Sequence, residues 1–249
     1  MNPGPEGAPT RKRNVSEFNA DVRANGGYVY TTNAQLSSIA ANRRMTEAIL
    51  AALPAETASI IDIGCGDGTY TFALKQARPG MACTGFDPAE AAIESAGKRF
   101  PGVEYVVGDI LDPATLPKRR FDVAILRGVV HHLPDGAAGI DNAARLADRI
   151  IMVEPNGDNP IVKWLERNSS YHIGHEEQSH PFRQLKAWCE NGGRQVYSVA
   201  WVGFVPFLFP TLLVRMILPF QGLLERIGPL VRRFAGQIVI VYGKPPGPS

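Results

Sequence analysis

The feature that most constrains the fold is a glycine-rich turn directly after a short apolar run. Residues 58–63 are rich in isoleucine and lead without a break into Gly64, Gly66 and Gly68. An apolar run that ends in glycine is typical of a buried strand. Glycines at alternate positions permit a sharp turn, and they let a ligand approach the backbone where a Cβ atom would collide. This segment predicts a buried strand, a tight turn and then a helix over 69–77.

Strand-like and helix-like segments alternate beyond this turn. Strands are expected at 58–63, 81–86, 103–107, 121–126 and 149–153, and helices at 33–53, 69–77, 88–99 and 136–147. Asp87 is expected to cap the 88–99 helix, with Pro88 at its first position. Alternation at this spacing predicts βαβ units, and hence an α/β fold with a doubly wound, mainly parallel sheet and helices on both faces.

The regular alternation of strands and helices does not continue in the last part of the chain, beyond residue 155. Asn159-Pro160 and His180-Pro181 each predict the start of a helix, and two final strands are expected at 195–202 and 237–242. An apolar insertion at 205–235 separates these strands. Val205–Ser249 carries a net charge of +4, while the rest of the chain carries −2.

Length and composition bound the class of protein. The 249 residues suffice for one large α/β domain, and a hydrophobic content of 45% excludes global disorder. Residues 1–13 are expected to be a flexible tail without the apolar core of a signal peptide. The apolar stretch at 200–214 is shorter than the roughly 20 residues of a membrane span. Three cysteines without metal-type spacing indicate free thiols, and a cytoplasmic location is expected.

Polar or glycine residues follow four successive strands of the predicted sheet, the first of them through its glycine turn. Asp87 ends the second strand, Asp109-Ile110 follows the third, and Arg127 and the pair His131-His132 follow the fourth. The carboxyl ends of parallel strands form one rim, where α/β sheets bind ligands. A carboxylate 21 residues after Gly66 suits the hydroxyls of a ribose, and the next carboxylate suits the amine of adenine.

The same residues discriminate between nucleotides. The G-x-G-x-x-G pattern of nicotinamide enzymes is incomplete because Thr69 stands at its third glycine, and no phosphate-binding G-x-x-x-x-G-K-[ST] loop occurs. Asp62, just before the turn, would repel a pyrophosphate and attract a cation. A ligand with adenine, ribose and a cationic, amino-acid-like end fits these groups.

The chain resembles the small-molecule branch of the class I S-adenosylmethionine-dependent methyltransferases between residues 58 and 155. The likeness is carried by Ile61-Asp62-Ile63-Gly64-Cys65-Gly66-Asp67-Gly68, Gly85-Phe86-Asp87, Gly108-Asp109-Ile110, Phe121-Asp122-Val123-Ala124-Ile125-Leu126 with His131-His132-Leu133, and Ile151-Met152-Val153-Glu154-Pro155. The resemblance implies a Rossmann-like, seven-stranded mixed sheet whose last two strands are antiparallel.

The resemblance also implies S-adenosylmethionine as the cofactor. The cofactor contacts that it implies are Tyr30, Asp62, Gly64, Cys65, Gly66, Asp87, Pro88, Asp109, Ile110, Arg127 and His132. Tyr30 belongs to an expected N-terminal helical lid, residues 14–57, where an aromatic ring could shield the sulfonium by a cation–π contact or simply pack on the surface. Residues 58–249 are expected to form the methyltransferase domain.

Histidines are the candidate catalytic groups. The resemblance implies that His131 and His132 lie beside the methionine end of the cofactor, and one of them is expected to act as a base. The alternative is that both only hydrogen-bond to backbone at a strand end. Tyr171, His175 and Glu176 are substrate-side candidates, with a solvated loop as the alternative. A zinc site is disfavoured because Gly174 interrupts the helix that would bring its ligands together, so no metal is expected.

The expected reaction is methyl transfer by in-line displacement to an O, N or C atom of a small or lipid-like apolar acceptor. The 205–235 insertion is either a helical lid on the sheet or a basic, apolar surface that makes peripheral contact with a membrane.

A nucleic-acid or protein methyltransferase is a weaker alternative, because the near-neutral charge gives little grip on phosphates and the Asn/Asp-Pro-Pro-aromatic motif of amino-methylating enzymes is lacking. The other alternative is a cofactor-binding scaffold without catalysis. The oligomeric state stays open.

Overall fold

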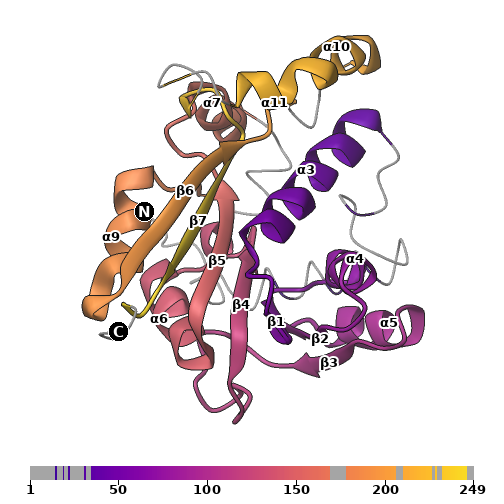
Figure 1. Cartoon of the computed structure of the whole chain (residues 1–249), viewed down its shortest axis with the longest axis vertical. Helices are drawn as coiled ribbons and strands as arrows, with labels where there is room; N and C mark the ends of the chain where they lie inside the picture. Colours follow the sequence, from indigo (N-terminus) through magenta and orange to yellow (C-terminus); the bar gives the residue numbers. More distant parts are fainter. Residues whose placement is uncertain are drawn as a thin grey trace, which may run out of the picture.

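A seven-stranded sheet forms the centre of the protein in the computed structural model (Figure 1). The structure describes residues 15, 19, 22, 31, 35–168, 178–205, 210–225, 228 and 232–245. The strands are β1 (Ser59–Ile63), β2 (Ala82–Asp87), β3 (Glu104–Val107), β4 (Phe121–Arg127), β5 (Ala147–Pro155), β6 (Gln195–Val202) and β7 (Gln237–Gly243). Their order across the sheet is β3-β2-β1-β4-β5-β7-β6.

The strand directions confirm the expected mixed sheet. The first five strands run parallel to one another, and β7 runs antiparallel to both β5 and β6. The strand order reverses on either side of β1 and β4, so the carboxyl ends of these two strands form the switch point at which such sheets bind ligands.

Helices cover both faces of the sheet, as expected. They are α3 (Leu36–Ala52), α4 (Thr69–Ala77), α5 (Glu90–Arg99), α6 (Gly136–Leu146), α7 (Pro160–Asn168), α9 (Phe182–Glu190), α10 (Thr211–Ile217) and α11 (Gln221–Leu224), with 3-10 turns η1 (Val130–His132), η2 (Asn191–Gly193) and η3 (Leu218–Phe220). One buried cluster joins α6 and α9 to the sheet, and a second cluster joins α3 and α4 to it.

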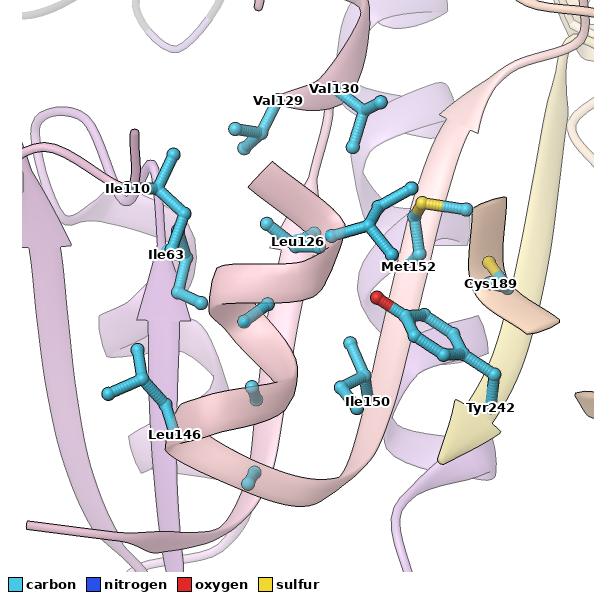
Figure 2. Close-up of a cluster of buried hydrophobic side chains, with 14 of the residues drawn as sticks. Ile63, Ile110, Leu126, Val129, Val130, Leu146, Ile150, Met152, Cys189 and Tyr242 are labelled. Carbon is cyan, nitrogen blue, oxygen red and sulfur yellow. The ribbon is translucent and has the colours of Figure 1, made fainter. Parts of the chain in front are cut away.

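The central strands are apolar because both of their faces are covered. Ile63, Leu126, Ile150 and Met152 point into the cluster under α6 and are at most 1% exposed, together with the aromatic ring of Tyr242 (Figure 2). Full burial of one such side chain contributes about 1.5–3 kcal/mol. All three cysteines are buried and form no disulfide.

The start of α5 corrects one expectation. Asp87 is not its N-cap and Pro88 is not its first residue, because α5 begins at Glu90 and its cap residue is Ala89. The strand β2 continues through Asp87, which pairs with Val107 of β3. The Asp87 carboxylate accepts hydrogen bonds from the backbone N–H groups of Ala89 and Gly66 instead.

Smaller corrections concern three other boundaries. Helix α3 begins at Leu36 rather than at residue 33, because Gln35 is extended. The strand β4 extends to Arg127, and β5 runs over Ala147–Pro155, taking in Ala147 because this residue pairs with Phe121.

The segment between β6 and β7 contains α10, η3 and α11, which lie beside the end of α3 in Figure 1. Val214 of α10 packs on Ala40 of α3 and on Val205. Among the described residues, every helix is too short or too polar to cross a membrane.

Candidate functional site

The turn after β1 requires its glycines. Gly64, Gly66 and Gly68 have φ angles of +72°, +56° and +77°, a region that residues with a Cβ atom rarely adopt. A Cβ atom on Gly64 would lie 2.5 Å from Cγ2 of Val129. The Gly64 N–H donates to the carbonyl of Phe86 over 2.7 Å, which holds the turn against the end of β2. The backbone is therefore bent into a cradle that only glycine can line.

Asp87 lies beside this cradle. Its two carboxylate oxygens accept hydrogen bonds from the N–H of Gly66 (2.9 Å) and from the N–H of Ala89 (2.8 Å), and the residue is 7% exposed. The neighbouring Cys65 is buried, and burial raises the pKa of its thiol, with Asp87 and Asp62 adding to the effect. Cys65 is therefore a neutral packing group in the turn.

Asp109 joins the same rim from β3. The N–H of Gly108 donates to the carbonyl of Asp87 over 3.0 Å, so the two strand ends are adjacent. The half-buried Asp109 carboxylate accepts from the N–H of Leu111 at 2.7 Å. Ile110 is 3% exposed and belongs to the main core cluster, as Figure 2 shows.

Asp62 lies beneath the turn rather than on its surface. It is 3% exposed and accepts a hydrogen bond of 2.5 Å from Oγ1 of Thr71. Burial raises the pKa of Asp62 to about 6, against the opposing effects of the Thr71 hydrogen bond and the nearby Arg127 charge. Its carboxylate is mostly ionised at neutral pH and contributes negative potential below the cradle.

Arg127 connects the site to α3. Its guanidinium lies 3.7 Å from the ring centroid of Tyr70, and it donates to Oγ1 of Thr46 (2.8 Å) and to the carbonyl of Asn42 (3.0 Å). Burial raises the pKa of Tyr70 to about 12, which keeps the phenol neutral. These contacts make Arg127 a link between β4, α4 and α3.

Asp67 is a site residue that the sequence argument did not select. It is 1% exposed and accepts hydrogen bonds from Oγ1 of Thr31 (2.6 Å) and from the N–H of Thr69 (3.1 Å), with Arg99 at 3.5 Å. It ties the N-terminal segment to the glycine turn. In the sequence, the feature that could have identified Asp67 is its position between two glycines of the turn, Gly66 and Gly68.

Glu154 is the second missed residue, and it organises the histidines. It is 2% exposed at the end of β5, and its Oε1 accepts from the N–H groups of Val129 and Val130, both at 2.8 Å. Its Oε2 contacts Nδ1 of His131 at 2.8 Å. The signal was a glutamate directly after the apolar run at 150–153; a carboxylate that is buried there must have partners.

The histidine pair lies in η1, directly after β4. The rings of His131 and His132 have centroids 4.0 Å apart, and His131 is 8% exposed. When Nδ1 of a neutral His131 donates to Glu154, Nε2 is the basic nitrogen of the ring. The expected alternative, a histidine that only bonds to backbone, does not describe His131, because its ring contacts a buried carboxylate.

A third histidine approaches this pair. The N–H of Gln178 donates to the carbonyl of His131 over 3.2 Å, which places the chain before α9 against η1. Burial lowers the pKa of His180, and Glu154 partly offsets that effect, while His131 and Lys163 add to it.

Four predicted site residues, Tyr30, Tyr171, His175 and Glu176, lie outside the described residues. Within the described part of the chain, no three His, Cys, Asp or Glu side chains gather as a metal site would require. The rim residues Asp87 and Asp109, the glycine turn and the two histidines are brought to one edge of the sheet, as the sequence predicts.

Comparisons with known proteins agree with this arrangement. Residues 61–149 match the family model described as a methyltransferase domain. The chain is 41% identical over 75 residues to a trans-aconitate 2-methyltransferase from Acidovorax sp., covering 29% of each chain. It is 34% identical over 125 residues to the Methylobacterium nodulans protein of the same name, covering 48% of this chain and 47% of the other. The matched region therefore spans less than half the length of these relatives.

Solved structures extend the likeness in fold to nearly the whole chain. A magnesium protoporphyrin IX methyltransferase from Synechocystis with bound S-adenosylhomocysteine superposes with a TM-score of 0.63 at 16% identity, covering 95% of this chain and 98% of the other. An S-adenosylmethionine-dependent methyltransferase from Thermotoga maritima gives a TM-score of 0.64 at 18% identity, covering 95% and 98%.

Proposed function

We propose that this chain, which carries a class I S-adenosylmethionine-dependent methyltransferase domain, binds S-adenosylmethionine at the carboxyl ends of β1, β2 and β3 and methylates a small or lipid-like acceptor. The observation that carries the proposal is the cradle at Gly64–Gly68 with the Asp87 carboxylate beside it. The cofactor supplies an electrophilic methyl group on a sulfonium.

The residues of the rim suit an adenosine. Asp87 accepts the ribose hydroxyls, Asp109 accepts the adenine amine, and Ile110 lines the base. The positive φ angles of the turn expose backbone where a Cβ atom would otherwise stand. In addition, Oγ1 of Thr69, directly after the turn, is buried without a hydrogen-bond partner among the described residues. A ligand in the cradle gives this hydroxyl a partner.

The charges beneath the cradle suit the methionine end. The buried Asp62 favours a cationic group above it, since its carboxylate is mostly ionised at neutral pH. Arg127, which the sequence also suggests as a cofactor contact, acts by fixing α3 and Tyr70 at the edge of the site.

His131 is the proposed base, and Glu154 is its positioning residue. A carboxylate at Nδ1 orients the ring and stabilises the imidazolium that forms when Nε2 takes a proton from the acceptor. His132, whose ring packs on His131, is the proposed cofactor contact of the pair. Because methyl transfer is an in-line displacement, placing donor and acceptor in line supplies much of the remaining rate enhancement.

A small-molecule acceptor is favoured over nucleic acid. The net charge of +2 gives little grip on phosphates. The named relatives act on trans-aconitate, and a further relative, 37% identical over 95 residues, is a ubiquinone biosynthesis O-methyltransferase from Methylobacterium nodulans. An acidic or quinone-like small molecule is the class of acceptor to test first.

The helices between β6 and β7 form an apolar face that suits an anionic membrane surface. Helix α10 buries Val214, yet its opposite side carries Leu212 and Met216, which are 71% and 61% exposed. Phe220 and Leu223 extend this face at 60% exposure each. A surface helix normally turns polar residues outward. Exposed apolar side chains in a region of net charge +4 favour contact with anionic lipid, which would deliver a lipid-like acceptor beside α3.

The first experiment separates binding from turnover. Calorimetric titration of S-adenosylhomocysteine should give saturable binding at one site. Incubation with methyl-labelled S-adenosylmethionine and either trans-aconitate or a quinol should then transfer the label. If S-adenosylhomocysteine does not bind, the proposed function is wrong. If it binds and no acceptor of either class is labelled, the acceptor class is wrong.

Vesicle flotation tests the membrane face. The wild-type protein should float with vesicles containing phosphatidylserine, and the Leu212→Asp/Met216→Asp variant should not. Val107→Asp, on the edge strand β3 where Val107 is 48% exposed, is the matched control and should float like the wild type. Equal flotation of all three proteins, or of none, would remove the membrane assignment.

A further inference from the structure

A groove of about 390 Å³ lies on residues other than those of the proposed cofactor site. It is lined by Asp158, Phe182, Trp201, Arg232 and Arg233. Asp158 follows β5, Trp201 belongs to β6, and the two arginines precede β7. The groove therefore lies at the β5-β7-β6 side of the sheet, whereas the glycine turn, Asp87 and Asp109 belong to β1, β2 and β3.

The arginine-bearing segment is anchored to the end of β5. The side-chain amide of Asn156, which is fully buried, donates to the carbonyls of Arg232 (2.8 Å) and Ala235 (2.9 Å). The amide of Asn159, 3% exposed, donates to the carbonyls of Phe234 and Ala235 at 3.1 Å each. The backbone that carries both guanidinium groups is thus held by buried hydrogen bonds.

Ion pairing leaves both arginines of the groove available to a ligand. Within the described part of the chain, no ion pair involves Arg232 or Arg233. The Arg232 guanidinium lies 4.6 Å from the ring centroid of Trp201. Among the residues that line the groove, Asp158 is the one acid. One of its carboxylate oxygens is already engaged, because it accepts a hydrogen bond from the N–H of Phe182 at 2.9 Å. Two arginines against one acid leave a net charge of +1 on the groove.

The rest of the lining is aromatic. Phe182 and Trp201 meet edge to face with centroids 5.3 Å apart. Guanidinium groups match carboxylate and phosphate oxygens in geometry, and aromatic rings pack against an apolar body. This combination suits an oxyanion attached to an apolar group rather than a bare ion.

The groove and the histidine cluster share one segment of chain. Phe182 lines the groove, and His180, two residues earlier, interacts electrostatically with Glu154 and His131. Gly157 permits this approach, since a Cβ atom on it would lie 2.4 Å from the backbone carbonyl of His180. Residues 180–182 therefore connect the groove to the cluster of His131 and Glu154.

We infer that the Arg232–Arg233 groove binds the carboxylate or phosphate group of the methyl acceptor, with the apolar body of the acceptor against Trp201 and Phe182. That the ligand is the methyl acceptor rests on the proposed function. That the groove binds an oxyanion rests on the geometry of the groove alone.

Calorimetry with amphiphilic probes tests it. Octanoate and octyl phosphate should bind the wild-type protein, and octanol, which lacks the anion, should bind at least tenfold more weakly. Arg232→Gln/Arg233→Gln should weaken the anionic probes tenfold or more. Arg215→Gln, which removes an exposed charge from α10, is the matched control and should bind them like the wild type. The tighter of the two anionic probes identifies the head group as carboxylate or phosphate.

Two results would overturn the inference: failure of both anionic probes to bind the wild-type protein, or equal weakening by the Arg215→Gln control. S-adenosylhomocysteine is titrated into each variant as well, and its affinity should stay unchanged because the arginines lie outside the cradle. A wild-type protein that binds octyl phosphate or octanoate in the groove but not S-adenosylhomocysteine would retain the oxyanion site and reject the methyltransferase function.

Discussion

The two ends of the sheet differ in how their functional groups are held. On the β1–β4 side, Asp62, Asp67 and Asp87 are buried, and each accepts hydrogen bonds from the turn or from α4. On the β7–β6 side, Arg232 and Arg233 are exposed, and helix α10 presents Leu212 and Met216 to solvent. The family model covers residues 61–149 and ends before this second region.

The difference corresponds to the two binding tasks of the proposed function, cofactor binding on the β1–β4 side and acceptor binding on the β7–β6 side. In the proposed function, the cofactor is always the same molecule, so fixed backbone groups and buried carboxylates can hold it. Replacing such a buried carboxylate also costs stability. The groups that we propose to bind the acceptor, Arg232 and Arg233, lie at the surface, where substitutions usually change stability by less than about 0.5 kcal/mol. Variants on the two sides should therefore fail in different assays.

The largest effect is expected at Glu154. Glu154→Gln replaces a buried carboxylate that accepts from Val129, Val130 and His131 with a group that can accept through one oxygen only. We expect a loss of about 3 kcal/mol in the free energy of unfolding, measured by urea denaturation, because buried donors lose their partners. Glu56→Gln, in an exposed turn, is the control. Equal stability of the two variants would mean that Glu154 does not organise η1.

Asp87 comes next and tests the cradle. Asp87→Ala should raise the calorimetric Kd for S-adenosylhomocysteine by about 30-fold or more, corresponding to about 2 kcal/mol for unpaired ribose hydroxyls. Asp112→Ala, at an exposed position beyond β3, should leave the Kd unchanged. An unchanged Kd in the Asp87 variant would place the ribose elsewhere.

Asp62 gives a pH dependence with a definite sign. Burial raises its pKa to about 6, so the folded state favours the protonated acid. The stability that this acid contributes is present below its unfolded pKa of about 3.9 and is lost as pH rises through about 6. Asp62→Asn keeps an acceptor for Thr71 and removes the charge. The variant should gain up to about 2 kcal/mol over the wild type between pH 4.5 and pH 7.5 in urea titrations. A difference that does not vary with pH would contradict the shift.

The smallest effect is expected on the exposed face of α10. Leu212→Ser should change the unfolding free energy by less than about 0.5 kcal/mol, because Leu212 is 71% exposed. Val214→Ser, two residues away and fully buried against Ala40, should cost about 2 kcal/mol or more. Thermal unfolding of both variants compares them directly. A large loss at Leu212 would show that this face packs within the protein.

The local elements of the sheet could be read from the sequence, because each depends on neighbouring residues. The isoleucine run of β1, the glycines at 64, 66 and 68 and the turns at Asn159-Pro160 and His180-Pro181 indicate strands, a cradle and helix starts without reference to the rest of the chain. The rim position of Asp87 and Asp109 follows equally, since parallel strands bring their carboxyl ends to one edge.

Only the tertiary structure decided which polar groups of the site are hydrogen-bond partners, because these groups are distant in sequence. Glu154 meets His131 across 23 residues, and Asp67 meets Thr31 across 36. Asn156 holds the carbonyl of Arg232 across 76 residues, and this bond helps to place the arginine beside Trp201. Hydrophobic periodicity records which side of an element is buried, but it carries no information about which polar group faces another across the packed layers. Packing of β5 between β4 and β7 brings these side chains within reach, and the histidine support and the basic groove exist only as a result of that packing.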